Sequence, residues 1–186
     1  KRGMRDCAEK LAPATITVWE WVKRVMLPTP AKFHYVFNLR DLSRIFEGVL
    51  RVPKDAFKSE KMIIQLWRHE CLRVLGDKLT TNVDKDKLVE QLLEVAEQVF
   101  PAKTVREVVK AGDVYFAGFL RDDVYDDDDV LVSEAPRVYE FGGSLNDLKP
   151  RVNDFLGFYN TEHPQKRMDI VLFNDALEHM LRIARV

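Results

Sequence analysis

Successive blocks of apolar residues at helical spacing fill most of the first 110 residues, and they constrain the fold more than any other feature. The first block runs from Pro13 to Leu27, and later blocks begin near Asn38, Ser59 and Asp84. Apolar side chains that recur every three to four residues lie along one side of an α-helix, and that side is then buried. The sequence therefore predicts several amphipathic helices around a common core.

Capping and breaking residues mark where these helices begin and end. Asn38 is a favourable N-cap, and Asp41 three residues later supports the same helix start. Pro53 stops that helix because proline has no backbone N–H to donate. Its predicted apolar face comprises Leu39, Leu42, Ile45, Phe46, Val49 and Leu50.

Two stretches of the helical part depart from the regular helical pattern. Residues 33–37 are aromatic and strand-like in composition, and they could equally form an extended connector packed under the helices. Gly76 lies inside the apolar pattern of the helix that begins near Ser59, which weakens the last turn of that helix. A short helix around residues 105–109 is also predicted.

The character of the chain changes after Gly112. An acidic stretch, 122–129, lies between short apolar runs, and two further helices are predicted, at 145–159 and from Phe173 onwards. The run Asp126–Asp129 lacks the ligand spacing, the central glycine and the closing glutamate of an EF-hand, so a solvated acidic loop is predicted.

Charge and apolar run lengths exclude several classes of protein. The formal net charge is −1, which argues against bulk binding to nucleic acid or to acidic membranes. No apolar run reaches the roughly 18 residues that a membrane-spanning helix needs. Two well-separated cysteines, Cys7 and Cys71, form neither a disulfide framework nor a zinc motif, and they fit a reducing compartment.

Motifs for catalysis are missing from the sequence. His69-Glu70 begins like a zinc-protease motif, but Arg73 stands where the second histidine ligand would be. No glycine-rich phosphate-binding loop and no nucleophile elbow occur, so we expect no metal site and no catalytic residue in this chain. The chain alone should not hydrolyse a nucleotide.

Arg40 and Arg44 form the most informative pair of charged residues. They lie one turn apart at the start of a capped helix, where two cations repel each other and oppose the helix dipole. A locally unfavourable arrangement of this kind suggests an anion site. The alternative is that Asp41 and Glu47 neutralise both arginines on a solvated face.

Three segments in the same order resemble the dynein heavy chain family, at its third AAA+ module and the start of its fourth. They are residues 27–46 (LPTPAKFHYVFNLRDLSRIF), 66–74 (LWRHECLRV) and 171–186 (VLFNDALEHMLRIARV). The Phe-Asn-Leu-Arg sequence at residues 37–40 is similar to axonemal rather than cytoplasmic members. Together the three segments span most of the chain.

The resemblance implies a mainly α fold. Residues 1–112 would be the small helical lid subdomain of an AAA+ module, residues 113–165 an irregular acidic connector with one helix, and residues 166–186 the N-terminal start of the next module. In this family the lid closes over a nucleotide, and an early arginine in one lid helix, the sensor-2 residue, reaches the phosphates.

Site residues and partners follow from the same resemblance. Arg40 would be the sensor-2 residue, Leu39 would line the adenine, and Arg44 is a second phosphate candidate. Val171 and Leu172 would lie near the adenine of the next module, with burial in a core as the alternative.

ATP or ADP, with magnesium held by residues outside this sequence, would be the ligand. The parent would be a microtubule motor of the cytoskeleton, in a cilium or flagellum. It would contact neighbouring AAA+ modules, microtubules and other dynein chains. The rival hypothesis is a stand-alone helical adaptor that binds a protein partner.

Overall fold

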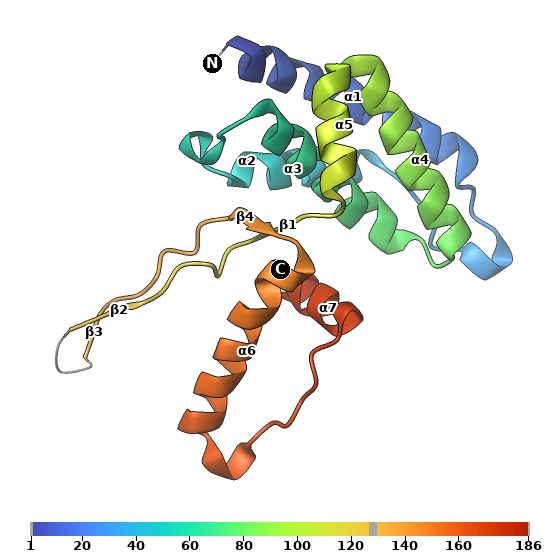
Figure 1. The fold of residues 1–186 in the computed structure, drawn as a ribbon. Helices are drawn as coiled ribbons and strands as arrows, with labels where there is room; N and C mark the ends of the chain where they lie inside the picture. Colours follow the sequence, from blue (N-terminus) through green and yellow to red (C-terminus); the bar gives the residue numbers. More distant parts are fainter. Residues whose placement is uncertain (1, 127–129, 186) are drawn as a thin grey trace. The chain divides into compact units, whose positions relative to one another are not determined.

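The computed structural model describes residues 2–126 and 130–185, and the chain is mainly α-helical, as predicted. It divides into two compact units, Lys1–Gly112 (unit 1) and Asp113–Val186 (unit 2), drawn in Figure 1. The predicted three-part division, at residues 112 and 165, stays a prediction. Asp127, Asp128 and Asp129 of the predicted acidic loop lie outside the described residues.

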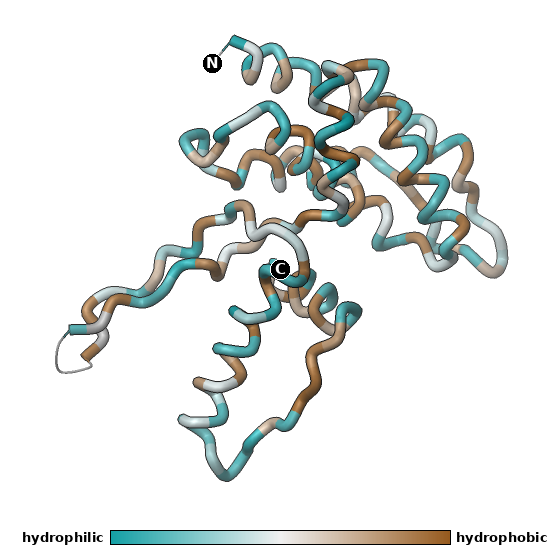
Figure 2. The backbone as a smooth tube through the Cα atoms, viewed as in Figure 1, coloured by the Kyte–Doolittle hydropathy of each residue, from teal (hydrophilic) through white to brown (hydrophobic). Residues whose placement is uncertain are grey.

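Unit 1 consists of helices joined by short turns. Figure 2 shows hydrophobic and hydrophilic residues alternating along these helices, as amphipathic packing requires. The helices are α1 (Arg2–Val25), α2 (Leu39–Arg51), α3 (Glu60–Leu75), α4 (Asn82–Val99) and α5 (Ala102–Ala111). The 3₁₀ turns are η1 (Pro30–Lys32), η2 (Lys54–Ala56) and η3 (Gly76–Lys78).

Helix α1 is longer than the sequence pattern suggested. A start at Pro13 was expected, whereas the helix begins at Arg2 and contains Pro13 in its interior. An interior proline costs about 3 kcal/mol because it removes a hydrogen bond and crowds the preceding turn. The turns before it bury Cys7 and Leu11 in the core, and this packing offsets that cost.

Residues 33–37 form a connector, not a strand. Tyr35 and Phe37 are buried under the helices, while Phe33 and Val36 face solvent. The extended-connector alternative is therefore confirmed. The backbone is not paired with a described strand here, and the burial of Tyr35 and Phe37 together with side-chain hydrogen bonds holds the segment in place.

The start of α3 agrees with the prediction, whereas the start of α4 corrects it. Ser59 caps α3 as predicted, with its Oγ accepting from the backbone N–H of Met62 at 3.3 Å. The helix gives way to η3 at Gly76, which explains the weak last turn. The N-cap of α4 is Thr81, and Asp84 lies inside the first turn instead of preceding the helix.

The centre of unit 1 is Trp67 on α3, which is 1% exposed. Its Nε1 donates to Thr15 Oγ1 of α1 at 2.9 Å, and its ring meets Phe100 edge-on at 5.6 Å between centroids. One side chain thus links α1, α3 and the end of α4. Other fully buried members of this core include Ala14, Val18, Val22, Ile45, Leu75, Leu88 and Leu92.

Helix α2 packs on α3 at a glycine. The carboxylate of Glu70 is fully buried and pairs with Arg73, with its Oε2 2.8 Å from Arg73 Nη2. A Cβ atom at Gly48 would lie only 1.9 Å from that Oε2. The absence of a side chain at Gly48 therefore allows the two helices to approach each other.

Unit 2 begins with two short antiparallel strand pairs. Strand β1 (Tyr115–Ala117) pairs with β4 (Glu140–Gly143), and β2 (Val124–Tyr125) pairs with β3 (Leu131–Ser133). Each pair has a register irregularity. Gly143 has a φ of 85°, a conformation that favours glycine, and it leads directly into the next helix.

Two helices complete unit 2, and both were predicted. Helix α6 (Leu145–Glu162) has a capping box formed by Ser144 and Asp147, and it ends before Pro164. Helix α7 (Asn174–Ala184) follows an extended segment. The buried apolar residues of unit 2 are Phe116, Ala117, Tyr139, Leu148, Leu172 and Leu177.

Candidate functional site

The start of α2 is held by a complete capping box. Asn38 has extended backbone angles, and its Oδ1 accepts from the N–H of Arg40 at 2.9 Å. In return the N–H of Asn38 donates to Asp41 Oδ2 at 2.9 Å. The indole N–H of Trp19 on α1 also donates to the Asn38 carbonyl at 3.2 Å. The predicted cap is confirmed, and it fixes where Leu39 and Arg40 leave the backbone.

Asp41 is buried and has a second partner that the sequence did not indicate. Its side chain is 2% exposed, and its Oδ1 accepts from Lys78 Nζ at 2.7 Å. The same ammonium donates to the Val36 carbonyl at 3.0 Å. Both oxygens of Asp41 are thus engaged inside unit 1.

Arg40 and Arg44 are exposed, and neither guanidinium has a hydrogen bond or ion pair within residues 2–126 and 130–185. Neutralisation by Asp41 and Glu47 does not occur. Asp41 pairs with Lys78, and Glu47 pairs with Arg51 at 2.8 Å. The two arginines therefore present unneutralised positive charge beside a helix N-terminus, where the dipole adds to it.

Leu39 does not lie on the buried face of α2, contrary to the predicted apolar stripe. It is 70% exposed, and Leu50 at the other end of the helix is exposed as well, while Ile45 is buried. Both lie at the edge of the stripe, where no other described residue covers them. Leu39 therefore presents an apolar side chain to solvent at the position before Arg40, and Val36 of the connector is exposed as well.

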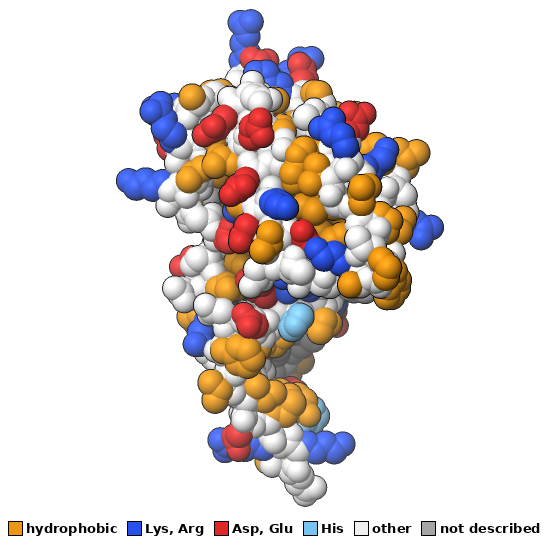
Figure 3. Space-filling view, turned by 90° about the vertical axis from the view of Figure 1, so that its right-hand side faces the viewer, with side chains coloured by type: hydrophobic (Ala, Val, Ile, Leu, Met, Phe, Trp, Pro, Cys, Tyr) orange, Lys and Arg blue, Asp and Glu red, His pale blue; other side chains and the backbone are white. Residues whose placement is uncertain are grey.

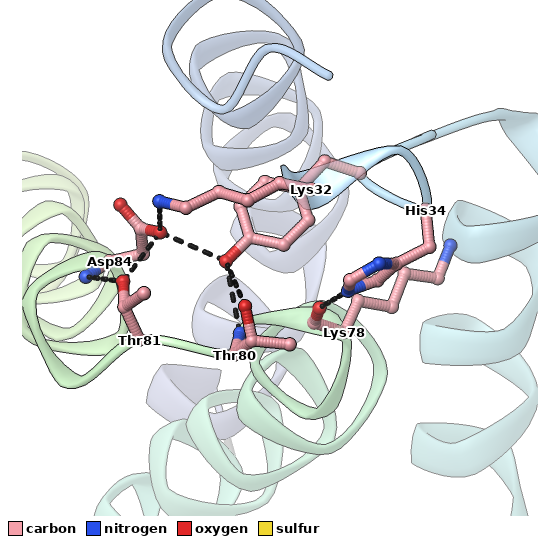
Figure 4. A network of polar contacts seen from close by, with 7 residues as sticks. Lys32, His34, Lys78, Thr80, Thr81 and Asp84 are labelled. Atoms are coloured by element: carbon pink, nitrogen blue, oxygen red, sulfur yellow. Dashed lines mark hydrogen bonds and ion pairs between the residues drawn. The ribbon is translucent and has the colours of Figure 1, made fainter. Parts of the chain in front are cut away.

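The connector before α2 is anchored by a polar cluster around Asp84. Figure 4 shows the Lys32 ammonium, Thr81 and Asp84 meeting at the start of α4. Tyr35 also donates from its hydroxyl to Asp84 Oδ2 at 2.9 Å, and Thr81 donates at 2.7 Å. The Lys32 hydrogen bond, followed by that of Thr81, lowers the pKa of Asp84 from 3.8 to about 2.

Val171 and Leu172 lie in unit 2, in the extended segment before α7. Figure 2 shows the part of this segment that leads into α7 as a continuous hydrophobic stretch. Val171 is 81% exposed, whereas Leu172 is 5% exposed and belongs to the unit 2 core. The two neighbours thus differ, and core packing is what the structure shows for Leu172.

Residues with catalytic or metal-binding chemistry give no second site. No group of three or more potential metal ligands occurs in the described residues. Burial raises the pKa of the Cys7 thiol to about 11 and raises the pKa of Cys71 as well, so neither thiol is poised to react. Glu70, the partner of His69 in the rejected protease motif, is buried against Arg73.

The surface carries charge of both signs. Figure 3 shows basic and acidic side chains on the same face, along with exposed apolar ones. No helix in the part of the chain that the structure describes is long and apolar enough to cross a membrane.

The sequence pattern missed Lys78 entirely. A lysine in a short turn after a helix is ordinary, and no local spacing relates it to Asp41, which lies 37 residues earlier. Only folding brings the two together.

Comparison with known proteins gives consistent matches. Residues 11–110 match the family described as AAA+ lid domain. Dynein axonemal heavy chain 5 of Rattus norvegicus is 39% identical over 188 residues. The match covers 100% of this chain and 5% of that relative.

Two Chlamydomonas reinhardtii proteins are also similar. The dynein-1-alpha heavy chain of the flagellar inner arm I1 complex is 40% identical over 181 residues, which cover 95% of this chain and 4% of the relative. The dynein gamma chain of the flagellar outer arm is 33% identical over 196 residues, covering 96% and 4% respectively. The chain therefore spans about a twentieth of the length of these curated relatives, and the adaptor alternative receives no support from them.

Proposed function

We propose, from the premise that this chain belongs to the AAA+ lid domain family, that unit 1 is the nucleotide-responsive lid of one module in a dynein motor ring. Arg40 would contact the phosphates of ATP or ADP, Leu39 would contact the adenine, and Arg44 would add a second cation. Magnesium, held by residues outside this sequence, would supply further charge neutralisation when bound.

A single observation carries this proposal: the guanidinium of Arg40 is exposed and unpaired at a rigid, capped helix start. The carboxylate that follows it in the sequence, Asp41, is held by Lys78 and by the backbone N–H of Asn38. A planar guanidinium suits phosphate oxygens, and an adjacent apolar side chain suits a base. The residues present therefore fit a nucleotide that binds between this lid and a neighbouring subdomain.

The nucleotide state of this module would be coupled to the rest of the ring because the contact between Arg40 and the nucleotide depends on which phosphates are present. A nucleotide that contacts Arg40 in one lid orientation more strongly than in another shifts the equilibrium between them. Loss of the γ-phosphate would weaken the contact and allow the lid to rotate. Val171 would line the adenine site of the next module, whereas the burial of Leu172 fits a packing role.

The parent's partners and location are part of the same proposal. Neighbouring AAA+ modules would contact the lid directly, while microtubules and other dynein chains would be reached through the parent heavy chain. The similar proteins are named as axonemal and flagellar, which supports a place in the cytoskeleton of a cilium or flagellum.

The decisive experiment is Arg40→Ala in the heavy chain that contains this segment. We expect nucleotide affinity at this module to fall about ten- to a hundredfold, since a hydrogen bond to a charged group contributes about 1.5–3 kcal/mol. Binding of fluorescent ATP and ADP analogues and microtubule gliding would be measured. Arg24→Ala is the matched control, because Arg24 is an exposed arginine on α1 of the same unit. Equal affinity and equal motility in wild type and Arg40→Ala would overturn the assignment.

A further inference from the structure

Lys78 lies at the end of η3, in the turn between α3 and α4, and it contacts three residues of the α1–α2 connector. Its backbone carbonyl accepts from His34 Nε2 at 3.0 Å, a contact drawn in Figure 4. Its side chain reaches further along the connector, to the Val36 carbonyl at 3.0 Å. The ammonium also lies 5.1 Å from the centroid of the Phe37 ring. Lys78 thus contacts the connector from His34 to the start of α2.

The side-chain contact with Asp41 gives Lys78 a role beyond packing. A cation near a helix N-terminus is unfavourable by itself, because the helix dipole is positive there. The carboxylate of Asp41 lies between the two: Oδ2 accepts from the Asn38 N–H and Oδ1 accepts from Lys78 Nζ. The Lys78 side chain is 26% exposed and that of Asp41 is 2% exposed, so solvent screens the pair weakly.

We propose that Lys78 is a positioning residue for nucleotide response, which holds the start of α2 and thereby orients Arg40 and Leu39. The proposal rests on the function proposed above for Arg40. Lys78 itself points into unit 1 and does not touch the nucleotide. Its contribution is to keep the Asp41 carboxylate in the capping box, so that Arg40 leaves the helix in a fixed direction.

Loss of the ammonium has a clear physical consequence. Without Lys78 the buried Asp41 carboxylate has no cationic partner, and a buried charge that loses its partner is strongly destabilised. Asp41 would then turn toward water, the N–H of Asn38 would lose its acceptor, and the first turn of α2 would open. Arg40 sits in that turn, so its contact with phosphate would weaken even though its own side chain is unchanged.

The test is hydrogen exchange of the parent heavy chain with and without ADP, following the peptide that covers residues 38–46. The variants are Lys78→Met, which keeps the length of the side chain and removes its charge, and Lys78→Arg, which restores the charge. Lys103→Met is the control, because Lys103 is an exposed lysine on α5. Arg40→Ala alone and combined with Lys78→Met complete the set, and nucleotide affinity is measured for each.

In Lys78→Met we expect exchange at the start of α2 without nucleotide to be about tenfold faster. Nucleotide affinity should fall, and Lys78→Arg should restore most of both. In the Arg40→Ala background, Lys78→Met should lower affinity by much less than it does in the wild type, because the phosphate contact is already lost and only the orientation of Leu39 is still disturbed.

The results that would overturn the role of Lys78 differ from those that would overturn the function proposed for Arg40. If Arg40→Ala weakens nucleotide binding but Lys78→Met does not, or if their effects simply add, positioning by Lys78 is wrong and the proposed function stands. If Arg40→Ala has no effect on affinity, the proposed function fails first, whatever Lys78→Met does to exchange. A uniform rise in exchange throughout unit 1 in Lys78→Met would indicate general destabilisation and would overturn the positioning role.

Discussion

Units 1 and 2 differ in how much of their own apolar surface they bury. Unit 1 packs residues from every one of its α-helices into one core, with Trp67 and Leu75 nearly inaccessible. In unit 2, α6 and α7 each bury a single residue, Leu148 and Leu177. Large side chains of unit 2 that remain exposed include Phe155, Phe158, Ile170, Val171 and Phe173.

A similar contrast holds for the most buried ion pairs, although unit 1 also has exposed pairs such as Arg5–Glu9. The Asp41–Lys78 pair of unit 1 is nearly buried, whereas in unit 2 Arg151 pairs with Asp122, whose side chain is 78% exposed. Buried pairs fix geometry, and exposed pairs contribute little to stability. The start of α2 in unit 1 is therefore held by buried contacts, whereas unit 2 relies less on its own interior.

The largest expected effect is the difference in stability loss between an aromatic truncation in unit 1 and one in unit 2. Trp67→Ala should lower the free energy of unfolding by about 4 kcal/mol, because it removes a buried aromatic ring and leaves a cavity. Phe158→Ala in unit 2 should change it by less than about 0.5 kcal/mol, since that ring is 66% exposed. Chemical denaturation followed by circular dichroism measures both. Similar losses in the two variants would show that the contrast between the cores is wrong.

A smaller effect, of opposite sign in the two units, is expected at two helical glycines. Gly48→Ala should destabilise unit 1 by about 2 kcal/mol, because the new Cβ would displace the buried Glu70 carboxylate. Gly157→Ala should stabilise α6 by about 0.5–1 kcal/mol, since nothing lies near its Cβ position and alanine favours helix. Thermal unfolding of each variant gives the sign. A stabilising Gly48→Ala would contradict close packing of α2 on α3.

The smallest expected effect is on acid stability. The pKa of Asp84 is lowered from 3.8 to about 2, chiefly by its hydrogen bond from Lys32. Its ionised form therefore stabilises the fold above about pH 4, and this contribution is lost as the pH falls toward 2.

Asp84→Asn should flatten the pH dependence of unfolding between those values, measured by denaturation at a series of pH values. Asp122→Asn, in the exposed pair of unit 2, is the matched control for removal of a surface carboxylate. If Asp84→Asn left the slope of unfolding free energy against pH unchanged, the polar cluster around Asp84 would not be what holds the connector in place.

Local chemistry made much of unit 1 predictable. The cap at Asn38 and the cap at Ser59 rest on hydrogen bonds within three residues, so a short window of sequence reveals them. The exposed Arg40 followed from its place in the first turn of a capped helix together with the resemblance to dynein heavy chains. The predicted apolar face of α2 was wrong at Leu39 and Leu50. Both lie at the edge of that face, where burial depends on whether a residue from another part of the chain packs over them.

The sequence by itself determined where most helices lie and that two arginines stand at the start of α2, because periodicity and capping depend on near neighbours. It left open whether Asp41 and Glu47 neutralise those arginines, and the tertiary structure pairs both carboxylates elsewhere. Only the tertiary structure decided that α1 continues through Pro13, that the Glu70 carboxylate packs against Gly48, and that Lys78 forms an ion pair with Asp41. Each of these depends on a contact between residues far apart in the chain. Burial makes such contacts strong, and nothing in the local sequence records which distant residue will be the partner.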